Sequence, residues 1–328
     1  MINKIKRKIY FALSNNKSMQ GVLKLLIMVN NILFHWNERQ KMYHYGDENP
    51  DDTYYVIRPR GNTEGLLSTY FYVTESVSWA KKKNYIPFVD FSDSTCQYYV
   101  GREINGTYNA WEYFFKQPSD VRKEDLVSKR NVLKSGWFVF DKYQCRREKD
   151  EVQNGSEGRI KKDTNIAIQD YILKKAYELK NKILKDKNVL GVFIRGTDYV
   201  KLRPKGHSVQ PTIDQICEKV DEMISKSEID QIYLVTEDYD YYLKIKEKYG
   251  SMVVVADDRF VKNYDKKEYI SDVLVDDPYE RGLSYLIRLI ILSECDYMVS
   301  SIASGSIFVK NIRKRTAKEE YWFDLGTY

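Results

Sequence analysis

Residues 189–207 read VLGVFIRGTDYVKLRPKGH, and this stretch decides how the chain folds. Its first six residues, 189–194, are apolar or small and have the length and composition of a buried strand. The strand runs directly into Arg195 and Asp198, with a glycine and a threonine between them. A charged pair at the end of a buried strand is costly unless it is used or well satisfied. The stretch therefore predicts a site at the carboxyl end of a strand.

The segments on both sides of this strand alternate between helical and strand patterns. Before the strand, apolar residues recur at helical spacing from Ile168 to Ile183. After it, a capping box formed by Thr212 and Gln215 opens a second helix. The other expected elements are strands at 231–235, 252–256, 297–301 and 321–325, and helices at 239–250, 283–291 and 307–312. Strands that alternate with helices predict a doubly wound α/β domain.

The first half of the chain gives a similar pattern. Residues 54–57 and 86–91 read as buried strands, and residues 58–65, with a Pro and two Gly, read as a loop. Asn62 can cap a helix that runs to about Lys83. This βαβ unit predicts a parallel sheet, so we expect two Rossmann-like α/β domains that face a cleft, a GT-B-like arrangement. The predicted bounds are 1–40 for a basic amphipathic segment, 41–163 for the N-terminal domain and 164–328 for the C-terminal domain.

The net charge of the chain is concentrated near its N-terminus. The 328 residues carry a formal net charge of +6, and residues 1–40 account for all of it with seven Lys or Arg and a single Glu. A nucleic-acid-binding protein usually carries basic residues through its body, so no nucleic-acid partner is expected. Apolar residues such as Ile5, Ile9 and Phe11 accompany the basic ones. Two interpretations remain open: a helix on an anionic membrane surface, and an ordinary basic helix that covers the core.

The sequence has no pattern typical of secretion, of a membrane span or of a metal site. No clean apolar segment precedes a small-residue cleavage site. The longest apolar stretch, residues 21–34, is too short and too interrupted to span a bilayer. Cys96, Cys145, Cys217 and Cys295 lie far apart, so we expect four reduced thiols and no metal. The predicted location is the cytoplasm, with peripheral attachment to the inner face of the plasma membrane as a further option.

Ligands of open α/β sheets bind outside the carboxyl ends of the strands, and the first such end carries Arg195. Its planar, always-charged fork is suited to bidentate capture of a diphosphate. Gly196 lets the backbone approach a ligand, and Asp198 can orient Arg195 or touch the substrate. The alternative is a buried Arg195–Asp198 pair that only holds the loop together.

A second end carries Thr236, Glu237 and Asp238, which follow the strand at 231–235. Carboxylates there can accept hydrogen bonds from a base or ribose, or act as a general base. The spacing of Asp238 and Asp240 also imitates a metal-binding DxD motif. Acidic residues are favourable at any helix N-terminus, however, and this explains the pattern without a ligand.

A third end follows the strand at 297–301 and reads SSIASGS at 300–306. A small, hydroxyl-rich loop before a helix is a natural phosphate cradle. Its candidate donor-binding residues are Ser301, Ser304, Gly305 and Ser306. An ordinary capped turn is the alternative.

The fourth end is the loop after the strand at 54–57, which carries Arg60, Asn62 and Glu64. The loop lacks the GxGxxG spacing of nicotinamide-binding proteins, and the chain contains no Walker loop, GxSxG elbow or HExxH motif. Dehydrogenase, phosphate-loop ATPase, α/β-hydrolase and zinc-protease functions are therefore not indicated.

The order and spacing of these motifs resemble the fucosyltransferase superfamily of GT-B glycosyltransferases. The family's first motif, HxRxxD, is similar to residues 193–198, with Phe193 in place of the His. Its second motif resembles residues 236–238, and its third, an SSFS-like loop, resembles residues 300–306. Its glycine loop resembles GNTEGLLS at 61–68, and the resemblance runs from Tyr54 to the end of the chain.

This resemblance implies an inverting, metal-independent enzyme that moves fucose from GDP-fucose to a glycan or lipid-linked oligosaccharide in bacterial surface polysaccharide synthesis, with no cofactor. Arg195 would neutralise the departing diphosphate, and Asp198, Glu64 or Glu237 would be the base. Residues 236–238 and the serine-rich loop would contact the donor, and Arg60 and Asn62 the acceptor side. The alternatives are another nucleotide sugar on the same fold, or a non-catalytic nucleotide-binding protein with a degenerate site, which Phe193 suggests.

Overall fold

The structure of the protein is a computed structural model that describes residues 19, 21–22, 25–26, 28–29, 33, 39–60, 64–136, 166–186, 188–264, 270 and 276–328. Contacts within the chain divide it into two units. Unit 1 comprises Met1–Arg60, Ser76–Asp90 and Pro118–Arg146, and unit 2 comprises Gly61–Glu75, Phe91–Gln117 and Arg147–Tyr328. The expected boundary at residue 163 and most of the basic segment at 1–40 lie outside the described residues.

Unit 1 is built on a four-stranded sheet with the order β1-β4-β2-β3. Its strands are β1 (Lys41–Tyr43), β2 (Tyr54–Ile57), β3 (Ile86–Val89) and β4 (Val132–Lys134), and a 3₁₀ helix at Lys123–Ser128 precedes β4. Strand β2 pairs in parallel with β3 and with β4, whereas β1 is antiparallel to β4. Helix α3 (Leu66–Lys82) connects β2 to β3, so the predicted βαβ unit is confirmed.

Unit 2 contains a five-stranded, fully parallel sheet with the order β7-β6-β5-β8-β9. The strands are β5 (Val189–Phe193), β6 (Gln231–Val235), β7 (Val253–Val254), β8 (Tyr297–Ser301) and β9 (Glu319–Phe323). The chain builds the sheet outward from β5 to β7 and then returns to place β8 on the other side of β5. This reversal confirms the predicted doubly wound α/β fold and makes the β5–β8 junction its topological switch point.

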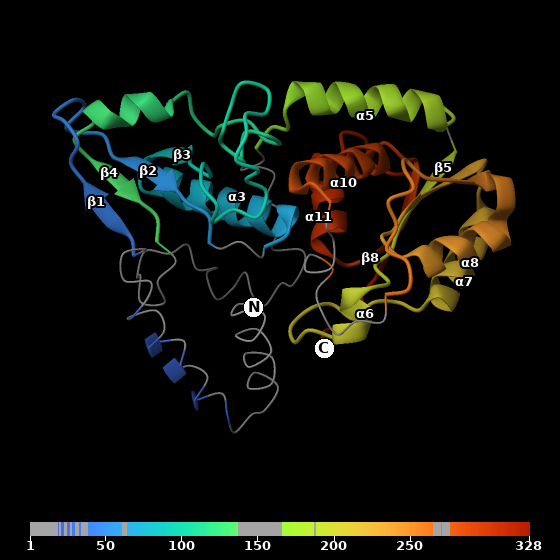
Figure 1. The fold of residues 1–328 in the computed structure, drawn as a ribbon. Coiled ribbons are helices and arrows are strands. Elements are labelled where there is room, and N and C mark those ends of the chain that lie inside the picture. The colour runs from blue at the N-terminus through green and yellow to red at the C-terminus, as the bar shows by residue number, and fades with distance from the viewer. Residues whose placement is uncertain are drawn as a thin grey trace. The chain divides into compact units, whose positions relative to one another are not determined.

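Helices cover both faces of this sheet (Figure 1). They are α5 (Asp170–Ile183), α6 (Asp198–Leu202), α7 (Ile213–Lys226), α8 (Tyr239–Tyr249), α10 (Pro278–Ser293) and α11 (Ser304–Ile312), with a 3₁₀ turn at Gly250–Met252. Apolar residues of α7 and α8 pack with Leu190 and Val192 of β5 in one core cluster. On the opposite face, Gly191 lets α10 approach, because a Cβ there would meet Leu292 at 2.5 Å. Among the helices of the described residues, none combines the length and apolar character that crossing a membrane requires.

The local signals explain where most of these helices begin. Thr212 accepts a hydrogen bond from the backbone N–H of Gln215, and the Gln215 side chain accepts one from the N–H of Thr212, so the predicted capping box of α7 is present. Helix α5 begins at Asp170 rather than at Ile168, which instead forms a bridge with Phe115. Helix α10 opens with Asp277 as cap and Pro278 in its first turn.

An aromatic cluster explains why residues 61–75 and 91–117, expected in the N-terminal domain, belong to unit 2. The Tyr70 ring of α3 lies 4.9 Å from Phe115 and 5.0 Å from Phe308 of α11, measured between centroids. Trp111 stands 4.7 Å from Phe115. Burial of large aromatic rings contributes strongly to stability, so these contacts attach both segments to unit 2. Sequence periodicity shows no such long-range packing.

Three of the four cysteines lie among the described residues, and all three are free thiols there. Cys96 and Cys295 are buried, and burial raises the pKa of their thiols to about 11 and about 12. A neutral thiol is a poor nucleophile, so both behave as core residues. Cys145 is outside the described residues.

Candidate functional site

The candidate site lies at the carboxyl ends of three adjacent strands of unit 2, namely β6, β5 and β8. Strand β5 leads into Arg195, β6 into Glu237, and β8 into the serine-rich turn before α11. The strands are parallel, so these three turns meet at one edge of the sheet. The edge includes the switch point between β5 and β8, where α/β folds of this kind bind ligands.

Arg195 is the central charge of this edge. Its Nη2 donates to Asp198 Oδ1 at 2.7 Å, and its Nε donates to Glu237 Oε1 at 2.9 Å. Its guanidinium also lies over the Tyr199 ring, 4.4 Å from the centroid. The Arg195 side chain as a whole is 18% exposed. The carboxylates hold two of its nitrogens, and no hydrogen bond from Nη1 to another described residue is found.

The charge of Arg195 is permanent. Burial alone would lower the pKa of the guanidinium, but the carboxylates of Glu237 and Asp198 outweigh it and raise the pKa well above its ordinary value. A guanidinium held in one orientation and fully charged meets the requirement for a preorganised anion-binding group.

The two carboxylates are occupied by neighbouring donors. Asp198 Oδ1 also accepts from the backbone N–H of Tyr199 at 3.0 Å, and its Oδ2 accepts from the N–H of Ile270 at 3.4 Å. Glu237 Oε1 accepts from the Thr197 hydroxyl at 2.9 Å. Both acids therefore hold Arg195 in position. The sequence interpretation gave this role to Asp198 as one option, but not to Glu237.

Asp238 and Gly196 are coupled by packing. Asp238 is the N-cap of α8, and its carboxylate accepts from the backbone N–H of Tyr241 at 3.0 Å. Its Oδ2 would lie 2.6 Å from a Cβ added at Gly196. Gly196 therefore makes room for Asp238, whereas the sequence interpretation assigned that room to a ligand. Thr236 is buried, and its hydroxyl accepts from the Asp238 N–H at 3.1 Å.

The serine-rich turn forms the start of α11, which begins at Ser304, earlier than predicted. Its cap position holds Ala303, which has no side-chain oxygen to accept from the first N–H groups of the helix. The Ser306 hydroxyl accepts from the Ala303 N–H at 3.0 Å and lies 2.7 Å from the Ser301 carbonyl oxygen, so it fixes the turn. The buried Ser301 hydroxyl has no hydrogen-bond partner among the residues that the structure describes. First-turn N–H groups without a side-chain cap are suited to an anion.

Two residues packed against this turn, Phe193 and Tyr285, were given no role in the site by the sequence interpretation, whereas Gly305 was predicted to bind the donor. A Cβ added at Gly305 would overlap the Tyr285 hydroxyl of α10 and lie 2.7 Å from the Phe193 ring. Phe193, at the position of the family's His, is 1% exposed and packs against the helix start. Tyr285 carries no sequence signal, because it is one of 28 tyrosines.

The residues predicted for the acceptor side lie in other segments. Arg60 is exposed and ends the first segment of unit 1. Glu64 precedes α3 in unit 2, where its carbonyl oxygen accepts from the Gln97 side chain. Arg58 donates through Nε to the Ser135 carbonyl at 2.7 Å and so ties β2 to the end of β4. Asn62 is outside the described residues.

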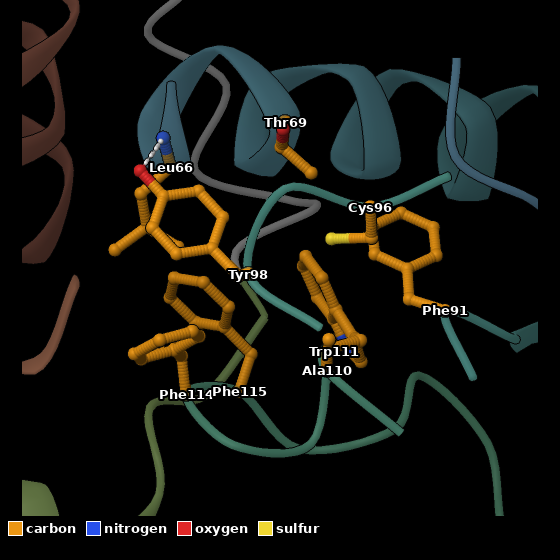
Figure 2. A pocket seen from close by; sticks show the side chains of 9 residues that line it. All are labelled: Leu66, Thr69, Phe91, Cys96, Tyr98, Ala110, Trp111, Phe114 and Phe115. Atoms are coloured by element: carbon orange, nitrogen blue, oxygen red, sulfur yellow. Dashed lines mark hydrogen bonds between the residues drawn. The ribbon is translucent and has the colours of Figure 1, made fainter. Parts of the chain in front are cut away.

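Neither of two hollows in the described residues has the character of a substrate site. The first, of about 10 Å³, is lined mainly by apolar side chains and is no larger than a single water molecule requires (Figure 2). There the Tyr98 hydroxyl accepts from the backbone N–H of Leu66 at 3.0 Å and caps α3. The second, of about 460 Å³, opens beside Tyr54 and Ile86, at the amino ends of β2 and β3. That is the opposite end from the one where ligands of such sheets bind.

Asp238 and Asp240 have the spacing of a DxD motif, but in the described residues they do not form a metal-ligating group with other side chains. Asp238 caps α8, and Asp240 is exposed in the first turn of the same helix. Within the part of the chain that the structure describes, no three His, Cys, Asp or Glu side chains are grouped as metal ligands.

Comparison with known proteins gives similarity only at the level of structure, because no family model and no curated protein matches the sequence. The crystal structure of fucosyltransferase NodZ from Bradyrhizobium aligns with 79% of this chain and 93% of its own, at 13% identity and a TM-score of 0.48. The crystal structure of POFUT1 in complex with GDP-fucose aligns with 85% of this chain and 100% of its own, at 10% identity and a TM-score of 0.45. Such values concern the course of the backbone and assign no activity. Both alignments cover most of this chain and nearly all of the matched chain.

Proposed function

We propose that this protein is a glycosyltransferase that transfers a sugar from a nucleotide sugar. One observation carries the proposal: Arg195 is held by two carboxylates, with part of its side chain exposed, at the switch point of a parallel sheet. The first turn of α11, which has no side-chain cap, follows β8, the strand that pairs with β5 at the switch point. A permanent cation and free N–H groups at one edge are the groups that a diphosphate requires.

The chemistry follows from these groups. The acceptor hydroxyl oxygen forms a bond to the anomeric carbon while the bond from that carbon to the diphosphate oxygen breaks. Negative charge grows on the departing diphosphate, and Arg195 stabilises it without rearranging. The hydroxyl proton passes to a base. Asp198 and Glu237 already support Arg195, which leaves Glu64 as the remaining candidate base.

The finer proposal follows the motif resemblance. It is an inverting reaction, with GDP-fucose as donor and a glycan or lipid-linked oligosaccharide of a bacterial surface polysaccharide as acceptor. Phe193 in place of His favours a second candidate, a non-catalytic nucleotide-binding protein. The burial of Phe193 against Gly305 supports a packing role for this residue, and that role is compatible with either candidate.

Nucleotide release tests the proposal. The full chain is incubated with GDP-fucose, other GDP-, UDP-, CDP- and dTDP-sugars, and mixed glycan acceptors, and the released nucleoside diphosphate is measured. We expect one donor to give acceptor-dependent release that persists in excess EDTA, because Arg195 supplies the positive charge. Binding of a nucleotide without release under any condition would favour the non-catalytic candidate. Release that stops in EDTA and returns with Mn²⁺ would contradict the metal-independent mechanism.

We also propose that residues 1–40 bind an anionic membrane surface, where the acceptor would be found. Each basic residue near such a surface contributes about 1 kcal/mol. Replacing Lys4, Lys6, Arg7 and Lys8 by Gln should therefore abolish most co-sedimentation with phosphatidylglycerol vesicles and leave activity on soluble acceptors unchanged. Replacing Lys81, Lys82 and Lys83, at the end of α3, is the matched control. Equal sedimentation of the N-terminal variant and the unmodified chain would contradict the proposal.

A further inference from the structure

The hydroxyl group of Tyr285 lies beside the first turn of α11. The residue lies on α10, and its hydroxyl oxygen reaches the place where Gly305, in the first turn of α11, would carry a Cβ. Among the described residues no hydrogen bond is made to this hydroxyl. Other tyrosines of unit 2 use theirs: Tyr233 donates to the Arg288 carbonyl at 3.2 Å, and Tyr249 contacts Asp221 at 2.9 Å.

The hydroxyl also lies near the end of β5, because the same Cβ position at Gly305 is 2.7 Å from the ring of Phe193, two residues before Arg195. Tyr285 interacts electrostatically with Arg195, Glu237 and Tyr199. Burial raises the pKa of Tyr285, and Arg195 opposes this only in part. The phenol therefore stays protonated at neutral pH and remains a donor.

Three kinds of donor then converge from three elements. They are the Arg195 guanidinium after β5, the N–H groups at the start of α11, and the Tyr285 hydroxyl from α10. Tyr285 is half-buried, and its hydroxyl is not among the buried polar atoms that lack a partner in the described residues, so a ligand can reach it. The glycine at 305 brings the hydroxyl against the helix start, and any side chain there would displace it.

We propose that the Tyr285 hydroxyl donates a hydrogen bond to the diphosphate of the nucleotide sugar, beside Arg195. This inference rests on the proposed function and names a further residue of the same site. It requires no change in the position of Arg195, which is already fixed by Asp198 and Glu237.

The test compares four proteins, the unmodified full chain, Tyr285→Phe, Tyr249→Phe and Arg195→Lys. Binding of GDP, UDP, CDP, ADP and inorganic pyrophosphate is measured by calorimetry, and Tm is measured without ligand. A hydrogen bond to a charged group predicts that Tyr285→Phe raises the Kd of the preferred nucleoside diphosphate at least about 10-fold. Its Tm without ligand should be unchanged, because no hydrogen bond within the protein is lost.

Tyr249→Phe is the matched control, since it removes a hydroxyl that contacts Asp221 and the Cys217 carbonyl at the far end of α8. It should lower Tm and leave the Kd unchanged. A normal Kd for Tyr285→Phe with a raised Kd for Arg195→Lys would overturn the role of Tyr285 alone. A lowered Tm of unliganded Tyr285→Phe would also overturn it, by showing that the hydroxyl is used within the fold. No binding of any of these ligands by the unmodified chain would overturn the proposed function as well.

Discussion

Arg195→Ala is expected to lower kcat about 10²- to 10³-fold, the scale for removing one preorganised donor to a developing negative charge. The bond from Arg195 to the diphosphate should strengthen as the sugar leaves, because charge concentrates on the leaving oxygen. Nucleotide-sugar affinity should therefore fall less than kcat does. Measuring kcat and KM with the donor that the release assay identifies checks this expectation.

A second variant is needed because Arg195→Ala also removes two ion pairs. Without Arg195, the carboxylates of Asp198 and Glu237, which are 5% and 19% exposed, lose their cation. Removing one partner of a buried pair costs about 3–5 kcal/mol of stability, so part of the Ala variant can unfold. Arg195→Lys keeps a charge near both acids and should remain folded, yet an ammonium cannot reproduce the planar fork. A folded Lys variant with normal kcat would contradict the diphosphate role.

The sequence was sufficient to predict the sheet of unit 2. Its strands are continuous apolar runs such as VLGVF and QIYLV, the pattern of strands buried on both faces. The helices between them follow apolar periodicity and caps. Strands β1 and β4 were not predicted, because each has only three residues and their pairing joins segments far apart in the chain. Short strands carry too little periodicity to be recognised.

Part of the site was predicted because its residues follow strands that the sequence pattern identifies. Arg195, Asp198 and Glu237 follow buried strands, so the topology alone brought them to one edge. Their mutual bonds were not predictable, because Glu237 reaches Arg195 from the neighbouring strand, 42 residues further along the chain. The contact of Tyr285 with Gly305 joins α10 to α11 and depends on side-chain packing, which local sequence does not encode.

Asp198→Asn separates positioning from base catalysis. The amide can still accept from the N–H of Tyr199, but it no longer neutralises Arg195, and its NH₂ group cannot accept from a guanidinium. We expect a loss of about 10²-fold in kcat, the scale for a catalytic group misplaced by about 1 Å. Stability should fall by about 3 kcal/mol, the lower end for breaking a buried pair. Chemical denaturation and steady-state kinetics on one preparation measure both effects.

The pH dependence of kcat/KM then decides the role. If Asp198 supports Arg195, the acidic limb of the profile belongs to another group and persists in Asp198→Asn at reduced height. If Asp198 takes the acceptor proton, the variant loses that limb. Glu64→Gln is the matched comparison, because Glu64 is the other proposed base. We expect the limb to be lost in Glu64→Gln and kept in Asp198→Asn. The reverse result would make Asp198 the base, and Arg195 would then be held at the diphosphate chiefly by Glu237 and Thr197, whose side chains share one hydrogen bond.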